Sequence, residues 1–206
     1  MDDHLRYSGA GEVAQRAALA AIIRSSPLLM EVLAGLRDDE LPDHLLVAGA
    51  IYNSVWNRLT GRPDLTGIND IDVFYFDESD LGYDAEDVVI RRLAARFASL
   101  PLPVQIRNQA RVHLWFPQKF GVPFMPLVSS EEMLGRYASK THAVAARLET
   151  DDSLTIVAPF GLDDIFSFRV TPNPVLMNKP AHDAKGARAK SIWPELTVLP
   201  WDSVAG

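Results

Sequence analysis

The most informative segment of the chain is INDIDVFYFD, residues 68–77. Residues 70–76 show the β-branched and aromatic enrichment of a strand, and turn-forming residues precede them at 61–69. Because side chains alternate along a strand, Asp70 and Asp72 project from the same face. Neighbouring carboxylates are the hard oxygen ligands that Mg²⁺ uses together with phosphate and water. The pair therefore predicts half of a divalent-metal site, and the alternative is a solvated strand start.

A strand, a glycine and a helix precede this segment. Residues 45–48 form a short buried-strand candidate that runs into Gly49, and apolar residues then recur at four-residue spacing as far as residue 59. A glycine at such a junction lets a phosphate approach the free N–H groups of the helix start. A phosphate there and a metal on the next strand are the two supports that a nucleoside triphosphate needs. Taken alone, Gly49 is explained more simply as a packing or turn glycine.

The segment 104–116 alternates polar and apolar residues so regularly that it predicts one long strand. One face would then carry five polar side chains, those of Gln105, Arg107, Gln109, Arg111 and His113. If this face lines a cleft, Arg107 and Arg111 lie roughly 13 Å apart, so that one can hold phosphate while the other meets an acceptor. The alternative is a water-facing side of the sheet. His113 is a candidate base near neutral pH, or simply a hydrogen-bonded histidine.

Helical periodicity and capping residues predict most of the other elements. Helices are expected at 12–24, from Ser26-Pro27 onward, after Asp84 as N-cap, after Ser129 in a capping box with Glu132, within 161–168 and near 184–190. Residues 143–148 and 154–158 are typical of a hairpin, and the proline-containing segment 171–206 indicates a wrapping tail.

Composition and charge bound the class of protein. The chain has 206 residues, of which 48% are hydrophobic and 23% charged, as in self-folding globular domains, and it has no cysteine for a disulfide or a cysteine-ligated zinc site. Its net charge of -7 repels nucleic acid at long range, so we expect no long nucleic acid as a partner. Residues 1–4 lack a leader pattern and no apolar run approaches the ~18 residues of a membrane span, so we expect no membrane association and a cytoplasmic location. The oligomeric state stays open.

Four groups of residues carry a resemblance to a known family: AGAI at 48–51 with VWN at 55–57, INDIDVFYFD at 68–77, NQARVHLW at 108–115 and APFGLDD at 158–164. Over nearly its full length the chain resembles the bacterial nucleotidyltransferase-like proteins, a divergent branch of the polymerase β superfamily. The resemblance implies an α/β (α+β) fold of the polymerase β type, with a mixed sheet flanked by helices, a C-terminal hairpin and a wrapping tail. It also implies one domain over 1–206, with N-terminal helices in 1–44, a core with the metal-binding strand in 45–128 and a C-terminal extension in 129–206.

The resemblance also implies roles for individual residues. Asp70 and Asp72 match the metal-binding aspartates of the superfamily, and Gly49 matches the glycine beneath the phosphates. Two departures from the superfamily pattern are visible. Ala50 stands where serine or a second glycine is usual, and the interval between the glycine and the aspartate pair is longer.

A third departure concerns a third carboxylate, which active members place on a neighbouring strand. No acid occurs between residues 101 and 130, and Gln105 occupies the expected place. A neutral amide cannot serve as a general base. Asp163 and Asp164 could supply the acid from a loop, although helix capping explains them equally well. Asp77 has the wrong strand parity to join the pair, and we interpret it as a strand-end or turn aspartate.

The sequence therefore predicts transfer of a nucleotidyl group from a nucleoside triphosphate to an unknown small acceptor, with release of pyrophosphate. One or two Mg²⁺ (or Mn²⁺) ions would be held by Asp70 and Asp72, while Arg107 and Arg111 would balance charge on the transferring group. The residues expected at the nucleotide are Gly49, Ala50, Asn53 and Gln105. The alternative, motivated by the missing acid, is a catalytically weak or inactive nucleotide-sensing or partner-binding protein that keeps the fold.

Two further groups of side chains have two explanations each. Tyr52, Trp56 and Trp115 could stack on a base, but aromatics in such patterns are usually core residues. Basic side chains of the tail could clamp phosphate, but a solvated face explains them more simply; they are Lys179, Lys185, Arg188 and Lys190.

Overall fold

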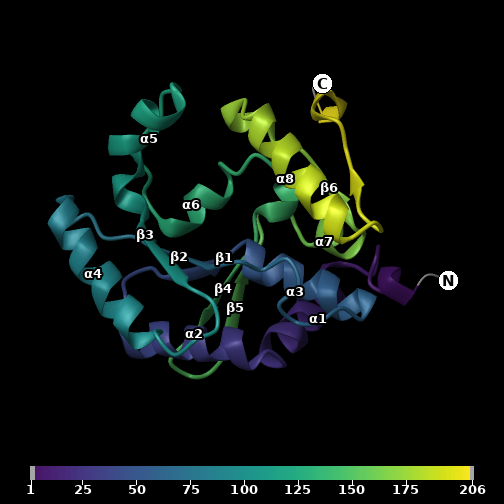
Figure 1. Cartoon of the computed structure of the whole chain (residues 1–206), viewed down its shortest axis with the longest axis horizontal. Helices are drawn as coiled ribbons and strands as arrows, with labels where there is room; N and C mark the ends of the chain where they lie inside the picture. The colour runs from purple at the N-terminus through teal and green to yellow at the C-terminus, as the bar shows by residue number, and fades with distance from the viewer. Residues whose placement is uncertain (1–2, 205–206) are drawn as a thin grey trace.

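The computed structural model describes residues 3–204 and contains a five-stranded sheet with the order β3-β2-β1-β4-β5 (Figure 1). Strands β2 and β3 run parallel, and the other neighbouring strands are antiparallel. The sheet is therefore mixed, as expected, and β4 and β5 form the expected hairpin. The strands are β1 (Leu45–Val47), β2 (Ile71–Tyr75), β3 (Val104–Asn108), β4 (Ala145–Leu148) and β5 (Leu154–Val157).

Helices flank this sheet on both sides. The α-helices of the described residues are α1 (Glu12–Arg24), α2 (Pro27–Asp38), α3 (Gly49–Thr60), α4 (Tyr83–Arg96), α5 (Val112–Phe120), α6 (Ser130–Leu134), α7 (Asp163–Phe166) and α8 (Lys179–Ile192). Short 3-10 helices lie at η1 (Asp3–Leu5), η2 (Gln109–Arg111), η3 (Lys140–His142), η4 (Pro174–Leu176) and η5 (Trp201–Val204). Strands β6 (Arg169–Val170) and β7 (Thr197–Val198) pair in parallel as a second, small sheet.

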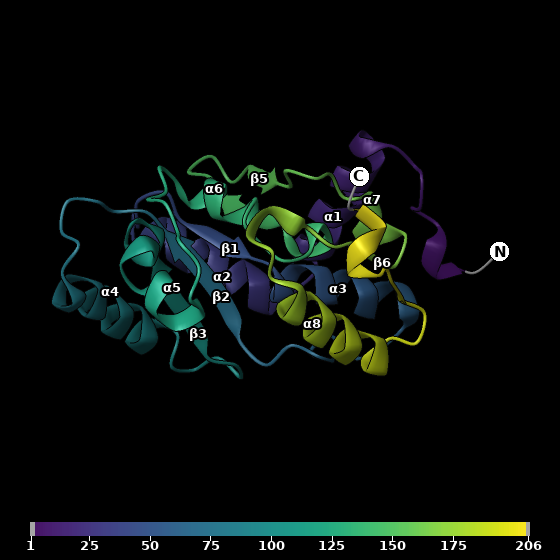
Figure 2. The same cartoon turned by 90° about the horizontal axis from the view of Figure 1, so that it is seen from above.

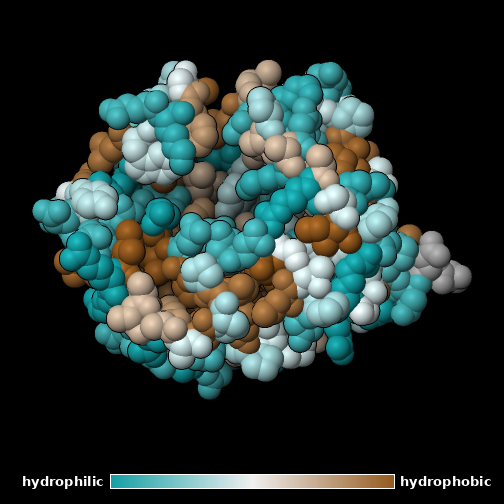
Figure 3. Space-filling view, viewed as in Figure 1, coloured by the Kyte–Doolittle hydropathy of each residue, from teal (hydrophilic) through white to brown (hydrophobic). Residues whose placement is uncertain are grey.

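The main sheet has one buried face and one partly open face. Ile71, Val73 and Ile106 point into the main core, where they pack against α1 to α4. Because side chains alternate, Asp72 and Phe74 point to the opposite face. A smaller apolar cluster joins part of that face to α6. Helices α5 and α8 stand on either side of it (Figure 2), and the surface between them is hollowed (Figure 3).

The predicted strand 104–116 is wrong beyond Asn108. The side-chain oxygen of Asn108 accepts a hydrogen bond from Ala110 N–H and turns the chain into η2 and then α5. The alternation was misleading because Val112 and Phe116 are also four residues apart, as on one face of a helix. Both are buried in a separate small cluster, so the helix buries the same apolar residues that the predicted strand would have buried.

The predicted helix starts are mostly confirmed. The Ser26 hydroxyl accepts from the N–H of the first turn of α2, and the Ser129 hydroxyl does the same for α6. Asp84 is not the N-cap of α4: the N-cap is Gly82, two residues earlier, so that Asp84 lies in the first turn. Helix α8 is longer than the expected 184–190.

Two expectations from the sequence concern the chain as a whole. The single domain 1–206, with its divisions at 44 and 128, stays a prediction, and residues 1, 2, 205 and 206 lie outside the described residues. Within residues 3–204 no single helix is long and apolar enough to cross a membrane. Helices α1 and α2 satisfy those limits only when taken together, and they meet at 91°.

Candidate active site

The turn between β1 and α3 leaves the start of the helix open. Ala48 has φ 56° and ψ -115°, a backbone conformation that residues other than glycine rarely adopt. The first backbone bonds of α3 run from Ile51 and Tyr52 N–H to Ala48 O. Within the described residues, the N–H groups of Gly49 and Ala50 therefore have no backbone partner. They form the positive end of the helix dipole, which favours an anion.

Three residues of α3 were predicted to contact the nucleotide. A Cβ added to Gly49 would meet no atom closer than 3.8 Å, so the neighbours do not require glycine and the space beside it is open. The side chain of Ala50 is 1% exposed and belongs to the main core, so its predicted contact with the nucleotide can come only from its backbone N–H. Asn53 lines the pocket and donates a 3.3 Å hydrogen bond to Gly67 O.

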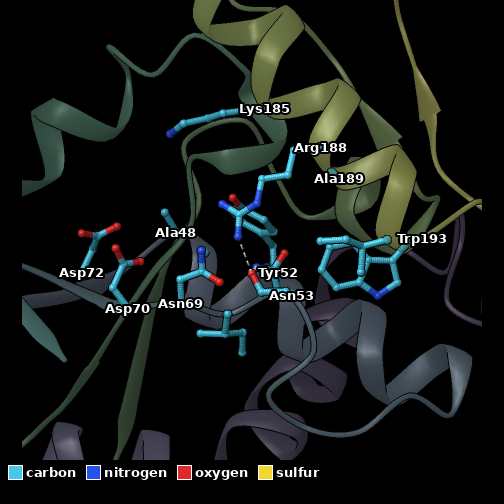
Figure 4. A pocket seen from close by; sticks show the side chains of 14 residues that line it. Ala48, Tyr52, Asn53, Asn69, Asp70, Asp72, Lys185, Arg188, Ala189 and Trp193 are labelled. Atoms are coloured by element: carbon cyan, nitrogen blue, oxygen red, sulfur yellow. Dashed lines mark hydrogen bonds between the residues drawn. The ribbon is translucent and has the colours of Figure 1, made fainter. Parts of the chain in front are cut away.

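The two aspartates lie next to this helix start. Asp70 immediately precedes β2 and Asp72 lies within it, and both line the same cavity, of about 230 Å³, as Gly49 does (Figure 4). Burial, followed by the charge of Asp70, raises the pKa of Asp72, whereas the charges of Lys185 and Arg107 act in the opposite direction. Two crowded carboxylates on one strand face form a site that a cation would stabilise.

Gln105 occupies the position expected for a third acid. It pairs in register with Asp72 across β2 and β3, and its Nε2 donates a 2.7 Å hydrogen bond to Asp70 Oδ2. Within residues 3–204, no group of three or more acidic, histidine or cysteine side chains is arranged to hold a metal. The donor set still fits a Mg²⁺ ion that takes two carboxylates and completes its octahedron with water and phosphate oxygens.

Asp163 and Asp164 do not supply the missing acid. Both carboxylates form ion pairs with Arg169, and Asp163 also accepts hydrogen bonds from Gly9 N–H and Gln15 Nε2. Neither residue lines the cavity with the aspartate pair. Asp163 therefore links the N-terminal segment to α7.

The predicted arginine pair is separated. Arg107 lies on the Asp72 face of the sheet, opposite Phe74 in register, but it does not line the cavity. Arg111 is not in the cleft, because the chain has already turned into η2: its side chain is 11% exposed and pairs with Glu86. His113 lies in α5 instead of on a strand, with a buried Nδ1 that has no hydrogen-bond partner within residues 3–204.

The tail helix α8 supplies the other wall of the cavity. Lys185, Arg188, Ala189 and Ile192 all line it, at the spacing of one helical face. Figure 4 shows Arg188 reaching down from α8 toward the loop before the aspartates, and Lys185 extending from the same helix above the aspartates. The preferred solvated-face explanation is therefore incomplete for these two, which are exposed but also line the cavity. It holds for Lys179, which is half exposed and pairs with Asp183. The helical spacing of residues 185, 188 and 192 was the signal in the sequence that they share one face of α8.

The aromatic residues separate into pocket and core. Tyr52 lines the cavity and stacks on His142, with ring centroids 4.8 Å apart. Trp56 is fully buried and donates to Ile165 O, and Trp115 packs against Phe116 within the α5 segment. Trp193, which the sequence argument missed, closes the end of the cavity away from the aspartates.

Asp77 is a turn residue, as predicted. Its carboxylate accepts hydrogen bonds from both the N–H and the hydroxyl of Ser79, which lowers the pKa of Asp77. It therefore shapes the end of β2 and does not join the aspartate pair.

Comparisons with solved structures agree with the fold class. The chain is similar to a structure described as "The NMR structure of the protein reveals a CCA-adding enzyme head domain", with 26% identity, a TM-score of 0.71, and coverage of 88% of this chain and 94% of that one. Weaker similarities are to a "tRNA-processing enzyme (apo form 2)" (18% identity, 77% and 43% coverage, TM-score 0.46) and to a tRNA nucleotidyltransferase complexed with a primer tRNA and an incoming ATP analog (15% identity, 78% and 43% coverage, TM-score 0.42).

The sequence model of the family described as Nucleotidyltransferase matches residues 34–198. The chain belongs to this nucleotidyltransferase family, which confirms the resemblance found in the sequence. No curated protein matches the chain. Family and fold together support nucleotidyl transfer as the general type of reaction.

Proposed function

We propose that the protein transfers a nucleotidyl group from a nucleoside triphosphate to a small acceptor, with Mg²⁺ or Mn²⁺ held by Asp70 and Asp72. The observation that carries this proposal is that the two carboxylates and the open start of α3 at Gly49 line one cavity. A carboxylate pair and a helix N-terminus are complementary to the two parts of a metal-bound polyphosphate.

Each residue of the site has a separate task in this proposal. The N–H groups of Gly49 and Ala50 donate to phosphate oxygens, and the carboxylates of Asp70 and Asp72 hold the metal. When bound, the metal neutralises charge on the phosphates and polarises the reacting phosphorus. Arg107, on the same sheet face as Asp72, balances charge on the transferring group.

The proposed transfer occurs in one step, without a covalent intermediate on the protein. The acceptor hydroxyl oxygen forms a bond to the α-phosphorus, the bond from that phosphorus to its bridging oxygen breaks, and pyrophosphate leaves. The hydroxyl proton passes to water, because the Gln105 amide can orient a water molecule but cannot take the proton. We therefore expect slow turnover in comparison with a site that has a third carboxylate.

The proposed acceptor is a small molecule. A net charge of -7 gives the protein no general attraction for a polynucleotide backbone. The similar structure described as a CCA-adding enzyme head domain favours testing an RNA end as well. An RNA 3′ end therefore belongs in the assay beside the metabolites, and its use as the acceptor would contradict the small-acceptor part of the proposal.

A second candidate function rests on Gln105. It donates a hydrogen bond to Asp70, and a neutral amide cannot act as a general base. A protein of this kind can bind a nucleotide with Mg²⁺ and report on it to a partner without any turnover. Magnesium-dependent triphosphate binding in calorimetry without product formation would favour this function over transfer.

The test of the proposed function is direct. The protein is incubated with each labelled nucleoside triphosphate, Mg²⁺ and a panel of hydroxyl-bearing metabolites, and pyrophosphate is measured. We expect pyrophosphate from the wild type and none from Asp70→Ala. No pyrophosphate from the wild type, or equal release from the variant, would contradict transfer.

A further inference from the structure

Two basic side chains of α8 stand across the cavity from the aspartate pair. Lys185 and Arg188 are one helical turn apart and reach into the cavity from the same side (Figure 4). Arg188 Nη2 donates a 3.2 Å hydrogen bond to Gly67 O in the loop before Asp70. The ammonium group of Lys185 lies 5.9 Å from the ring centre of Tyr137.

Among the described residues, neither of these two cations has an acidic partner within hydrogen-bonding range. None of the salt bridges within residues 3–204 includes Lys185 or Arg188, although most arginines of the chain are in one. Both side chains are exposed on the cavity side of α8. Lys185 lines the same cavity as Asp72, so its charge faces the proposed metal site.

Helix α8 is held against the rest of the fold by hydrogen bonds near both of its ends. Near its start, the fully buried His182 bonds to Ser139 and to Leu199 O. After its end, Trp193 Nε1 donates a 3.0 Å hydrogen bond to Asn57 Oδ1. The two cations are therefore presented by a fixed wall, and a ligand has to match their charge.

We propose that Lys185 and Arg188 form a cationic wall that attracts the polyphosphate of the nucleotide and repels a bare divalent cation from Asp70 and Asp72, so that the metal enters together with the nucleotide. Two carboxylates and two cations cancel, so a bare metal ion would leave the site with two net positive charges. A nucleoside triphosphate carrying one Mg²⁺ is an anion, so it brings negative phosphate oxygens to the two cations as well as a metal ion to the two carboxylates. This inference rests on the proposed function, because the polyphosphate is that of the proposed substrate.

If the cationic wall acts as proposed, removing one of its charges should change the binding affinities of two ligands in opposite directions. Removing a positive charge should tighten the binding of Mn²⁺ alone and weaken the binding of ATP with Mn²⁺. It should affect AMP with Mn²⁺ much less, because AMP lacks the β- and γ-phosphates. A loss of structure would weaken all three, so the opposite signs separate an electrostatic role from a structural one.

The experiment compares Lys185→Met and Arg188→Met with Lys179→Met by isothermal titration calorimetry. Lys179 gives a matched control, because it lies on the same helix, loses the same charge and does not line the cavity. Thermal melting checks that each variant is folded, and Lys185→Arg keeps the charge and should bind as the wild type does. For Lys185→Met we expect about tenfold tighter Mn²⁺ and about tenfold weaker ATP with Mn²⁺.

The outcomes separate this inference from the proposed function. If the wild type binds ATP with Mn²⁺ but Lys185→Met and Arg188→Met bind both ligands as Lys179→Met does, the cationic wall is wrong and the proposed function stands. The wall is also wrong if both affinities change in the same direction. If the wild type binds no nucleoside triphosphate at all, the proposed function fails and this inference fails with it.

Discussion

Gln105 Nε2 donates a hydrogen bond of 2.7 Å to Asp70 Oδ2, across two strands that run parallel and hold Gln105 opposite Asp72. The group next to the two carboxylates is thus a neutral amide and not a third acid. The bond satisfies one lone pair of Asp70 and orients its carboxylate within the strand face. It leaves the site with two negative charges, which suits one cation better than two.

Changing Gln105 to glutamate should strengthen metal binding. A third carboxylate beside Asp70 adds a hard oxygen ligand, and we expect Gln105→Glu to bind Mn²⁺ at least about tenfold more tightly than the wild type. Without metal, the extra charge should lower the melting temperature, and saturating Mn²⁺ should restore it. Gln105→Met, which loses the hydrogen bond but adds no charge, is the control. Equal Mn²⁺ affinity in the two variants would show that position 105 is not at the metal.

Asp72→Asn should stabilise the metal-free protein. Burial and the charge of Asp70 raise the pKa of Asp72, so the ionised carboxylate costs stability at neutral pH. We expect the melting temperature to rise by about 2–4 °C, the shift that ~1 kcal/mol gives in a chain of this size. The gain should be largest at pH values above the raised pKa of folded Asp72, where the carboxyl is ionised in both the folded and the unfolded chain, and should vanish in acid, where it is protonated in both. A lower melting temperature in metal-free buffer would contradict this description of the site.

The ring of Trp193 approaches Gly67 so closely that this position has no room for a side chain. A Cβ at this position would lie 2.3 Å from the Trp193 ring, and the backbone has φ +74°. We expect Gly67→Ala to destabilise the fold by about 2–4 kcal/mol in urea unfolding, because both the backbone and the ring must move. Gly61→Ala is a matched control with φ +67° and open space around the added Cβ, and it should cost only about 1 kcal/mol. Equal losses would mean that Trp193 adapts freely.

His142 should make the fold sensitive to acid. Burial, assisted by the charges of Lys185 and His182, lowers the pKa of His142 to about 3. Below its unfolded pKa of ~6.5 the unfolded chain binds a proton that the folded chain does not, so stability falls as pH drops, by up to ~1.4 kcal/mol per unit.

The variant His142→Gln isolates this contribution. We expect it to reduce the fall in unfolding free energy between about pH 7 and about pH 5, leaving a residual slope in part from His44, whose pKa is also lowered by burial. The slope, measured by urea unfolding at several pH values, is compared rather than the absolute stability, since removing the His142–Tyr52 stack has its own cost. An unchanged slope would contradict a neutral buried His142.

Local patterns allowed the aspartate pair and the helix start of the site to be predicted from the sequence. The short spacing of Asp70 and Asp72 on a strand, and the glycine at the start of α3, are properties of a few adjacent residues, and the structure brings them into one cavity. The family resemblance placed Gln105 opposite the pair, and the strand register agrees.

The errors arose where distant contacts decided the outcome. The turn at Asn108 depends on Glu86, whose carboxylate accepts from Asn108 N–H and also pairs with Arg111, so alternation within residues 104–116 could not reveal it. Likewise, nothing local shows that Lys185 and Arg188 lie beside residues more than 100 positions earlier. That placement follows from the burial of Trp193 against α3 and Gly67.

The central claim is that one cavity holds a metal on Asp70 and Asp72 and a triphosphate at the start of α3. The most direct measurement is calorimetric titration of the four common nucleoside triphosphates, with and without Mn²⁺, into the wild type and into Asp70→Asn/Asp72→Asn. We predict Mn²⁺-dependent binding of at least one triphosphate to the wild type, with the Mn²⁺ dependence absent in the double variant. Nucleotide binding that is unaffected by Mn²⁺, or equal in the two proteins, would contradict it.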